Sequence, residues 1–358
     1  MRARDLGIVV GEGEPGPANA ITDVGGSRVG HTTLIEGDDV RTGVTVVFPH
    51  EGDPGSDPVF AGAHRLNGNG ELTGLEWIRE SGLLETPVAL TNTHSVGIVR
   101  DALVRHAVDQ NLGAGEEPWS LPVVGETWDG VLNDVNGFHV RAEHVDQAIE
   151  SASGGRVLEG AVGGGTGMIC HGFKGGIGTA SRVLSESDGG WTVGVLVQAN
   201  HGARSRLRVE GAPIGRDVGP ERIPLPGRAP DGARAGSIII LVATDAPLLP
   251  NQCERLAQRA TFGIARTGGA GENSSGDLVL AWSTGNRGLG DTLSTVTMLA
   301  NERIDPLFYA VIDATEEAIL NALLAAETMT GRGGATAHRL EPELLLDVLR
   351  RYGFAENG

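Results

Sequence analysis

Apolar residues recur along the chain with two different periods, which predict strands interleaved with helices. Five runs rich in β-branched residues have the length and composition of strands, and they lie at 43–48, 88–92, 192–199, 237–243 and 278–283. These segments and the helical ones between them lack the regular spacing of a doubly wound α/β sheet. The pattern therefore favours a layered α/β sandwich.

Helical periodicity is clearest after residue 250. One apolar helix face is formed, at helical spacing, by Cys253, Leu256, Ala257, Ala260 and Ile264. A second helix is expected to begin with Asp313 and Glu316 as a capping box and to stop at Gly331. Weaker patterns predict helices at 74–80, 101–110 and 145–152. On this pattern Cys253 belongs to the core and not to a reactive site.

One segment interrupts the alternation of strands and helices. Residues 211–236 are rich in proline, glycine and arginine, which predicts a long exposed loop. The loop ends at Gly236-Ser237, and the apolar run 238–242 that follows is the most strand-like in the chain. An exposed loop is therefore expected to meet a buried strand at a single Gly–Ser bond.

Composition excludes several classes of function. The chain has 28 basic and 46 acidic side chains and a net charge of −18, so nucleic-acid binding is not expected. Its one lysine, Lys174, belongs to no Walker A loop and no Ser-x-x-Lys motif, and only this residue could form a Schiff base. No apolar run reaches the roughly 18 residues of a membrane span. With two scattered cysteines and no signal-peptide pattern, we expect a cytoplasmic protein.

The remaining polar motifs predict neither a metal nor another cofactor. The ten histidines show no His-x-x-x-His spacing. Cys170 and His171 are adjacent, and on a strand their side chains would point to opposite faces and form no dyad. The glycine clusters at 163–167 and 175–178 fit turns or a backbone oxyanion nest better than a phosphate loop.

The Gly236-Ser237 junction has the arrangement that an N-terminal nucleophile precursor needs. Gly236 has no side chain to shield its carbonyl, so the Ser237 hydroxyl could attack it in an N-to-O acyl shift. Hydrolysis would then free an α-amino group with a pKa of about 7.7 to 8.0, which could act as the base for the hydroxyl of the same residue. A simple Gly–Ser turn is the alternative interpretation.

Several long motifs follow one another along most of the chain, at 19–24, 29–33, 67–74, 90–97, 132–134, 165–168, 175–182 and 314–331. In this order they resemble the family of DmpA and the β-peptidyl aminopeptidases. The resemblance implies an N-terminal-nucleophile-like αββα sandwich of the DmpA and ornithine acetyltransferase type, with 1–358 as a single catalytic domain. It also implies self-cleavage into an α chain, 1–236, and a β chain, 237–358, in a homo-oligomer of four processed protomers. No metal or cofactor is implied.

The resemblance also assigns roles to individual residues. Ser237 matches the nucleophile, and Asn200 matches an asparagine whose amide supports the oxyanion. Ser275 and Asp277 resemble the serine and the acidic residue that assist the nucleophile, one relaying a proton and the other orienting or charging it. Taken without the resemblance, 274–277 would be interpreted as a turn that precedes a strand.

Trp128 departs from the family pattern, which tends to place a tyrosine here. An indole N–H donates one hydrogen bond but transfers no proton at neutral pH, so Trp128 is expected either to stabilise charge or only to line the pocket. Glu126 and Asp129 flank Trp128. They are our hypothetical anchors for a positively charged substrate amine at an acidic mouth.

The Gly–Ser junction and the family resemblance together predict a self-processing serine aminopeptidase or amidase. The resemblance implies that it releases amino-terminal residues from peptides, amides or esters, including D- or β-amino acids. The expected partner is a small peptide or amide with a free amino terminus, and neither a nucleic acid nor a membrane. A related autoprocessed acyltransferase is one alternative. An unprocessed, catalytically silent homologue is the other, and Trp128 is the only hint of it in the sequence.

Overall fold

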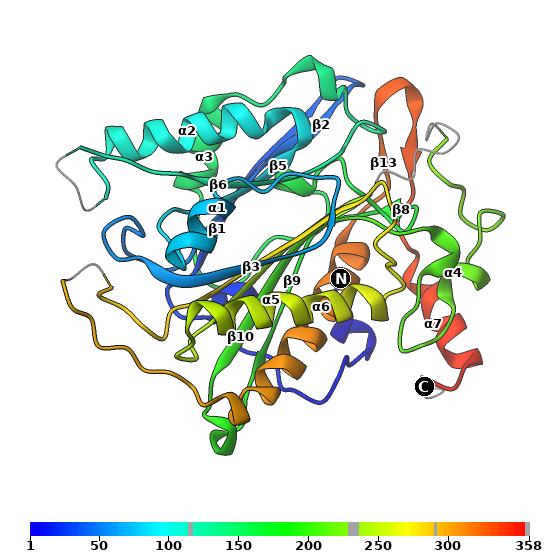
Figure 1. The fold of residues 1–358 in the computed structure, drawn as a ribbon. Coiled ribbons are helices and arrows are strands. Elements are labelled where there is room, and N and C mark those ends of the chain that lie inside the picture. The colour runs from blue at the N-terminus through cyan, green and yellow to red at the C-terminus, as the bar shows by residue number, and fades with distance from the viewer. Residues whose placement is uncertain (114–116, 228–235, 290–291, 355–358) are drawn as a thin grey trace.

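Two β-sheets form the centre of the molecule, which is described by a computed structural model covering residues 1–113, 117–227, 236–289 and 292–354 (Figure 1). The smaller sheet has the order β1 (Arg28–Glu36), β2 (Val40–Phe48), β5 (Val88–Asn92) and β6 (Val123–Thr127). The larger sheet has the order β4 (Leu83–Leu84), β3 (Val59–Gly68), β12 (Gly276–Ser283), β11 (Ser237–Thr244), β10 (Thr192–Asn200) and β9 (Gly176–Val183). Neighbouring strands run antiparallel except in the pairs β5–β6 and β11–β12.

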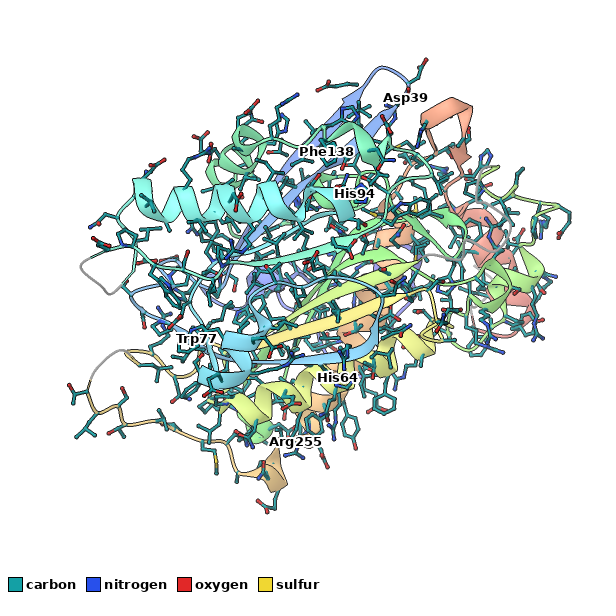
Figure 2. All side chains as sticks on the ribbon, turned by 45° about the horizontal axis from the view of Figure 1, so that its top comes forward. Asp39, His64, Trp77, His94, Phe138 and Arg255 are labelled. Atoms are coloured by element: carbon teal, nitrogen blue, oxygen red, sulfur yellow. The ribbon has the colours of Figure 1, made fainter. Side chains whose placement is uncertain are left out.

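Helices cover the outer face of each sheet. The smaller sheet carries α2 (Val96–Asp109) and α3 (Ala142–Glu150), whereas the larger sheet carries α5 (Pro250–Arg266) and α6 (Asp305–Ala325). Figure 2 shows the two outer layers from another side, with His94 near the start of α2 and Arg255 on α5. The order of layers is helix, sheet, sheet, helix, as the family resemblance implied.

The remaining elements are short and lie at the edges of these layers. The helices are α1 (Leu75–Ser81), α4 (Ile214–Asp217) and α7 (Pro342–Arg351). Two small hairpins are formed by β7 (Ile169–Cys170) with β8 (Phe173–Lys174), and by β13 (Met329–Thr330) with β14 (Thr336–Ala337). No helix within the described residues is long and apolar enough to cross a membrane.

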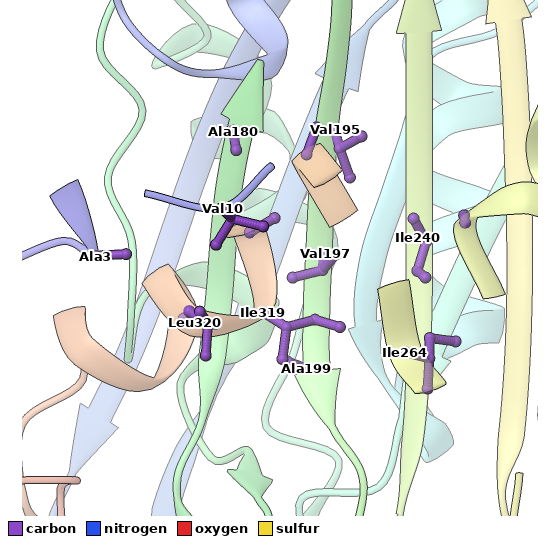
Figure 3. Close-up of a cluster of buried hydrophobic side chains, with 14 of the residues drawn as sticks. Ala3, Val10, Ala180, Val195, Val197, Ala199, Ile240, Ile264, Ile319 and Leu320 are labelled. Carbon is purple, nitrogen blue, oxygen red and sulfur yellow. The ribbon is translucent and has the colours of Figure 1, made fainter. Parts of the chain in front are cut away.

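Strand β11 explains how the layers are held together. Its side chains alternate between two cores, with Ile238, Ile240 and Val242 against α5 and α6. Ile239 and Leu241 instead pack between the two sheets. Because both faces of β11 are buried, the strand is apolar at nearly every position, and this made it conspicuous in the sequence. Figure 3 shows part of the helix-covered core, including Val197 of β10, Ile240 of β11 and Ile319 of α6.

The predicted start and end of the second helix were wrong. Helix α6 begins at Asp305 and ends at Ala325, so Asp313 lies in its interior. The carboxylate of Asp313 accepts a hydrogen bond of 2.6 Å from Nη1 of Arg266 on α5, and it caps no helix. Proline next to the true start supplies the fixed φ angle that suits a first helical turn.

The segment 211–236 is less exposed than expected. Ile214, Val218 and Ile223 are buried and join the core of the larger sheet. Prolines and glycines mark the turns correctly, but the apolar residues between the turns still pack inward. Residues 228–235 of the predicted loop lie outside the described residues.

Candidate active site

Three strands of the larger sheet bring the predicted site residues to one place. Strand β10 ends at Asn200 directly opposite Ser237, the first residue of β11. Strand β12 runs parallel to β11 and pairs Asp277 with Ile238. Because β-sheet register fixes neighbouring residues within about 5 Å, Asn200, Ser237 and Asp277 are held together by backbone pairing.

Ser237 is buried at this junction. The backbone N–H of Gly276 donates a 3.1 Å hydrogen bond to Ser237 Oγ, which fixes the hydroxyl beside the start of β12. Gly236 packs against the backbone of the opposite strand. A Cβ added to it would lie 2.7 Å from the Asn200 carbonyl oxygen and 2.9 Å from Cα of His201. Only glycine therefore fits before Ser237 without a shift of the backbone.

The orientation of the Asn200 side chain is fixed by two backbone groups. The Ile169 N–H donates a 2.7 Å hydrogen bond to Asn200 Oδ1, so the oxygen must face β7. Asn200 Nδ2 in turn donates to the Trp128 carbonyl at 2.9 Å. An amide nitrogen carries two hydrogens, so this contact accounts for only one of them.

Ser275 and Asp277 form a hydrogen-bonded pair at the start of β12. Ser275 Oγ donates to Asp277 Oδ1 at 2.5 Å, and both residues are buried. Burial raises the pKa of Asp277 to about 6, whereas the hydrogen bond from Ser275 and one from the Ile238 backbone act in the opposite direction. A carboxyl with a pKa in this range is suited to accept or orient a proton near neutral pH.

A cavity of about 620 Å³ opens beside these residues. Its lining includes Trp128, Asn200, His201, Gly236 and Glu272. Trp128 lines the cavity and touches Asn200 through its backbone carbonyl. The cavity is large enough for a short peptide or a small amide.

Glu126 lies in β6 and is buried, so it is not exposed at a mouth. Its Oε1 accepts a 3.0 Å hydrogen bond from the Glu71 N–H, and its Oε2 accepts one from the Thr93 hydroxyl. Gly70 lies between the Glu126 carboxylate and the start of β12. A Cβ added to Gly70 would lie 3.2 Å from Glu126 Oε1 and 3.0 Å from Cα of Gly276. Burial raises the pKa of Glu126.

Asp129 does not form part of an acidic mouth, and here the structure changes the prediction. Its side chain is only 1% exposed, and Oδ2 accepts a 3.0 Å hydrogen bond from Nδ2 of Asn92. Desolvation raises the pKa of Asp129 to about 6. The residue is adjacent to Trp128 in sequence, but the turn after β6 directs its carboxylate inward to β5.

The structure also corrects the interpretation of Cys170 and His171. Cys170 ends β7, but His171 lies in the following turn with φ of 48°, so the alternation of a strand no longer applies. Both side chains meet His201, which follows Asn200. Ligand atoms of the three residues all lie within 4.8 Å of one another.

Several groups that position the site residues could not be identified from the sequence, because they belong to the backbone. The N–H groups of Ile169 and Gly276 hold Asn200 and Ser237, and any residue type except proline could supply them. Lys174 was conspicuous only as the single lysine. Its buried Nζ donates to the carbonyls of Gly165, Met168 and Gly175, which braces the hairpin that carries Ile169.

Comparison with known proteins agrees with this geometry. The model of peptidase family S58 matches residues 19–337. The chain belongs to peptidase family S58. Its relatives include a protein named beta-peptidyl aminopeptidase BapA from Sphingosinicella microcystinivorans, which is 47% identical over 98% of this chain and 92% of the relative. The predicted family is therefore confirmed, and the chain is a serine aminopeptidase of this family.

Solved structures of other S58 peptidases confirm the fold. A beta-aminopeptidase from Burkholderia sp. superposes with a TM-score of 0.93 at 54% identity, over 99% of this chain and 100% of the other. The L-aminopeptidase D-Ala-esterase/amidase of Ochrobactrum anthropi gives 0.91 at 44% identity, over 99% of each chain. That structure is described as a prototype for the serine aminopeptidases and a variant of the Ntn-hydrolase fold.

Proposed function

We propose that this S58 peptidase releases amino-terminal residues, β-amino acids among them, from short peptides and amides, with Ser237 as the nucleophile of a processed chain. The observation that carries the proposal is the backbone register that sets Asn200 opposite Ser237 and Asp277 beside Ile238. The preference for β-amino acids is supported by the names of two relatives, the beta-peptidyl aminopeptidase and the beta-aminopeptidase from Burkholderia.

Maturation would begin with attack of Ser237 Oγ on the carbonyl carbon of Gly236. The C–N bond between the two residues breaks as a C–O bond forms, and the proton of the hydroxyl passes to the departing nitrogen. Water then hydrolyses the resulting ester. The products are a carboxylate on Gly236 and a free α-amine on Ser237, which divides the chain into 1–236 and 237–358.

Peptide cleavage would use the two groups that this step uncovers. The neutral α-amine of Ser237 takes the proton from Oγ while Oγ attacks the substrate carbonyl. The second N–H of Asn200 Nδ2 stabilises the oxyanion of the tetrahedral intermediate. The proton then passes to the leaving amine, and water releases the acyl group from Ser237. Ser275 and Asp277 hold a charged hydrogen-bonded pair one strand away, where they can relay a proton and favour the ionised intermediate.

Trp128 changes which residues would stabilise the oxyanion in this site. Its indole supplies no hydroxyl, and the contact that the structure does provide is from its carbonyl to Asn200. Stabilisation of the oxyanion would therefore depend on Asn200 more strongly than in a site that also contains a tyrosine. Trp128 itself would shape the wall of the cavity.

Glu126 is our proposed anchor for the substrate amine. The carboxylate is ionisable, buried and separated from Gly276 by Gly70 alone. A positively charged ammonium would offset the desolvation that raises the pKa of Glu126. Such an anchor would favour substrates with a free amino terminus over blocked ones.

The test is a substrate panel read by mass spectrometry. The purified chain would be incubated with amides of β-alanine, L-alanine and D-alanine, with and without an added acceptor amine. Release of the free amino acid, fastest from the β-alanine amide, supports the proposal. Transfer to the acceptor in place of water would favour an acyltransferase, and no turnover by a chain that stays full length would favour a silent homologue.

Assembly and location stay predictions. We propose a homo-oligomer of four processed protomers, which sedimentation at two protein concentrations would test. A reducing, cytoplasmic setting is supported by the two cysteines, both of which are free and buried.

A further inference from the structure

Cys170, His171 and His201 form a compact cluster of metal-ligand types behind the wall of the active-site cavity. Cys170 is at the end of β7, His171 is in the turn that follows, and His201 follows the last residue of β10. Cys170 Sγ lies 3.8 Å from His201 Nδ1. The rings of the two histidines meet edge to face with centroids 5.2 Å apart. All three side chains are buried.

The two imidazoles have unfilled hydrogen-bonding capacity. Nε2 of His171 and Nε2 of His201 are buried and have no hydrogen-bond partner among the described residues. Buried polar atoms of this kind are uncommon, because leaving them unpaired costs about 1 to 3 kcal/mol each. Two imidazoles with unpaired nitrogens, one of which has its other nitrogen 3.8 Å from a thiol, supply the ligand types of a metal site.

His171 also has the support that metal-bound histidines usually have. Its Nδ1 lies 3.1 Å from the Ala203 carbonyl, which fixes the ring and leaves Nε2 as the nitrogen without a partner among the described residues. The backbone N–H of His171 donates to the His201 carbonyl at 2.7 Å. The two ligand-bearing segments are thus joined to each other before any ligand binds.

We propose that Cys170, His171 and His201 bind a divalent cation that prefers sulfur and nitrogen ligands, with Zn²⁺ as the representative, and that this binding inhibits the peptidase. Zinc bonds of about 2.0 to 2.3 Å place neighbouring tetrahedral ligands about 3.5 Å apart, so atoms already within 4.8 Å need to move little. The thiol proton is released to solvent when the Zn–S bond forms. Three protein ligands leave the fourth position for water.

Charge and access favour a cation at this position. His201 and Gly172 line the 620 Å³ cavity, which gives an ion a route from solvent. Glu272 lines the same cavity, and its Oε1 is buried without a partner among the described residues. It interacts electrostatically with His171, so its carboxylate would compensate part of the positive charge of the ion.

Inhibition would follow from the neighbours of the ligands and rests on the proposed function. Cys170 follows Ile169, whose N–H holds Asn200 Oδ1. His201 follows Asn200 itself. A metal that draws Cys170 and His201 together changes both ends of this hydrogen bond, and so it disturbs the amide that stabilises the oxyanion. We therefore expect a lower kcat and a smaller effect on KM.

The binding test uses the metal alone and needs no turnover. The metal-free protein, as purified, would be titrated with Co²⁺ and followed by the thiolate-to-cobalt absorption band, and Zn²⁺ stoichiometry would be measured by equilibrium dialysis. We expect one ion per chain. Cys170→Ala should abolish the band and weaken Zn²⁺ binding at least tenfold. His171→Asn tests a second ligand with a residue that tolerates the left-handed backbone. Cys253→Ala is the matched control, because Cys253 is equally buried but lies in the α5 core.

Activity supplies the second readout. Zn²⁺ should inhibit the unmodified protein and Cys253→Ala, and it should inhibit Cys170→Ala at least tenfold less. Wild-type protein that shows no thiolate band, or Cys170→Ala that binds zinc or is inhibited as strongly as the wild type, would overturn the proposal. A protein that binds one ion through Cys170 but hydrolyses no amide would keep the metal site and contradict the proposed function instead.

Discussion

Asn200 and Ser237 are direct partners across the antiparallel pair β10–β11, at the end of one strand and the start of the other. The pairing holds the two backbones in register, and the Ile169 N–H then sets the direction of the Asn200 amide. The sheet itself therefore positions the proposed nucleophile and the proposed oxyanion donor. Because backbone pairing already sets this arrangement, the two residues are preorganised.

Replacing Asn200 by alanine should lower kcat with little change in KM. The lost N–H meets charge only in the tetrahedral intermediate, and loss of such a donor costs about 2.7 to 4 kcal/mol, or 10²- to 10³-fold in kcat. Asn251→Ala, in an exposed position on α5, is the control for an asparagine without this contact. Steady-state kinetics of processed protein would measure both variants. An unchanged kcat in Asn200→Ala would remove the residue from the mechanism.

The pH dependence of kcat/KM should show the titration of two groups, the carboxyl of Asp277 and the α-amine of Ser237. Asp277 has a pKa raised to about 6 by burial, so it is protonated below this pH and ionised above it. The α-ammonium of Ser237, with a pKa of about 7.7 to 8.0, must also lose its proton. We expect log kcat/KM to fall with a slope of about one below the amine pKa and about two below pH 6.

Asp277→Asn isolates the contribution of the carboxyl. The variant should be slower at every pH, and the steeper part of its profile below about pH 6 should disappear because the amide does not titrate. Profiles of both proteins with one uncharged leaving group are the measurement. If the wild type and the variant share the same slope at low pH, Asp277 is not the second group.

Most of the fold could be predicted where one strand or helix carries its own pattern. The predicted limits of β5 match the structure, and the predicted end of β11 differs from the observed one by a single residue. Both strands are apolar runs with clear ends. Helix α5 was found from one apolar face, which is buried as expected. These signals are local and depend on no partner.

Strands β3 and β9 were not predicted, and glycine is the reason. A Cβ on Gly178 of β9 would lie 1.9 Å from the Ala318 carbonyl of α6. A Cβ on Gly62 of β3 would lie 2.4 Å from the Glu254 nitrogen of α5. Close helix packing therefore requires glycine at these positions, and glycine weakens the pattern of a strand. The requirement comes from a distant segment and is invisible locally.

The same distinction between local signals and contacts with distant segments applies to the site residues. Ser237 was found from the junction of a loop and an apolar strand, whereas the roles of Asn200, Ser275 and Asp277 came from the family resemblance. The different environments of the Glu126 and Asp129 carboxylates could not be predicted from the sequence. They depend on which carboxylate faces β5 and which faces β12. The contact of Cys170 with His201 joins two segments that only the fold brings together.

Gly236→Ala should slow maturation although Ser237 is intact. The added Cβ would collide with backbone atoms of Asn200 and His201, and the scissile carbonyl would have to move away from the hydroxyl. Gly227→Ala is a matched control in the same segment, because a Cβ there meets no atom of the described residues within 4 Å. The time course of cleavage on a denaturing gel should be at least tenfold slower for Gly236→Ala alone. Equal rates for the two variants would contradict the packing argument.

The substitutions Glu126→Gln and Asp129→Asn should have different effects, one on KM and the other on thermal stability. Loss of a charged hydrogen bond to the substrate amine, about 1.5 to 3 kcal/mol, should raise KM at least tenfold in Glu126→Gln. Asp129→Asn should leave KM unchanged and lower Tm, since its carboxylate bonds to Asn92 inside the protein. Kinetics and thermal unfolding of both variants are needed. An unaltered KM in Glu126→Gln would exclude it as the amine anchor.

The central claim is that one residue supplies both the hydroxyl and the amine. Intact-mass analysis of Ser237→Ala, combined with a turnover assay on the same sample, tests it most directly. We predict two fragments, 1–236 and 237–358, for the wild type, and a single full-length chain without measurable turnover for the variant. Cleavage between the same two residues in Ser237→Ala, together with wild-type turnover, would contradict the account.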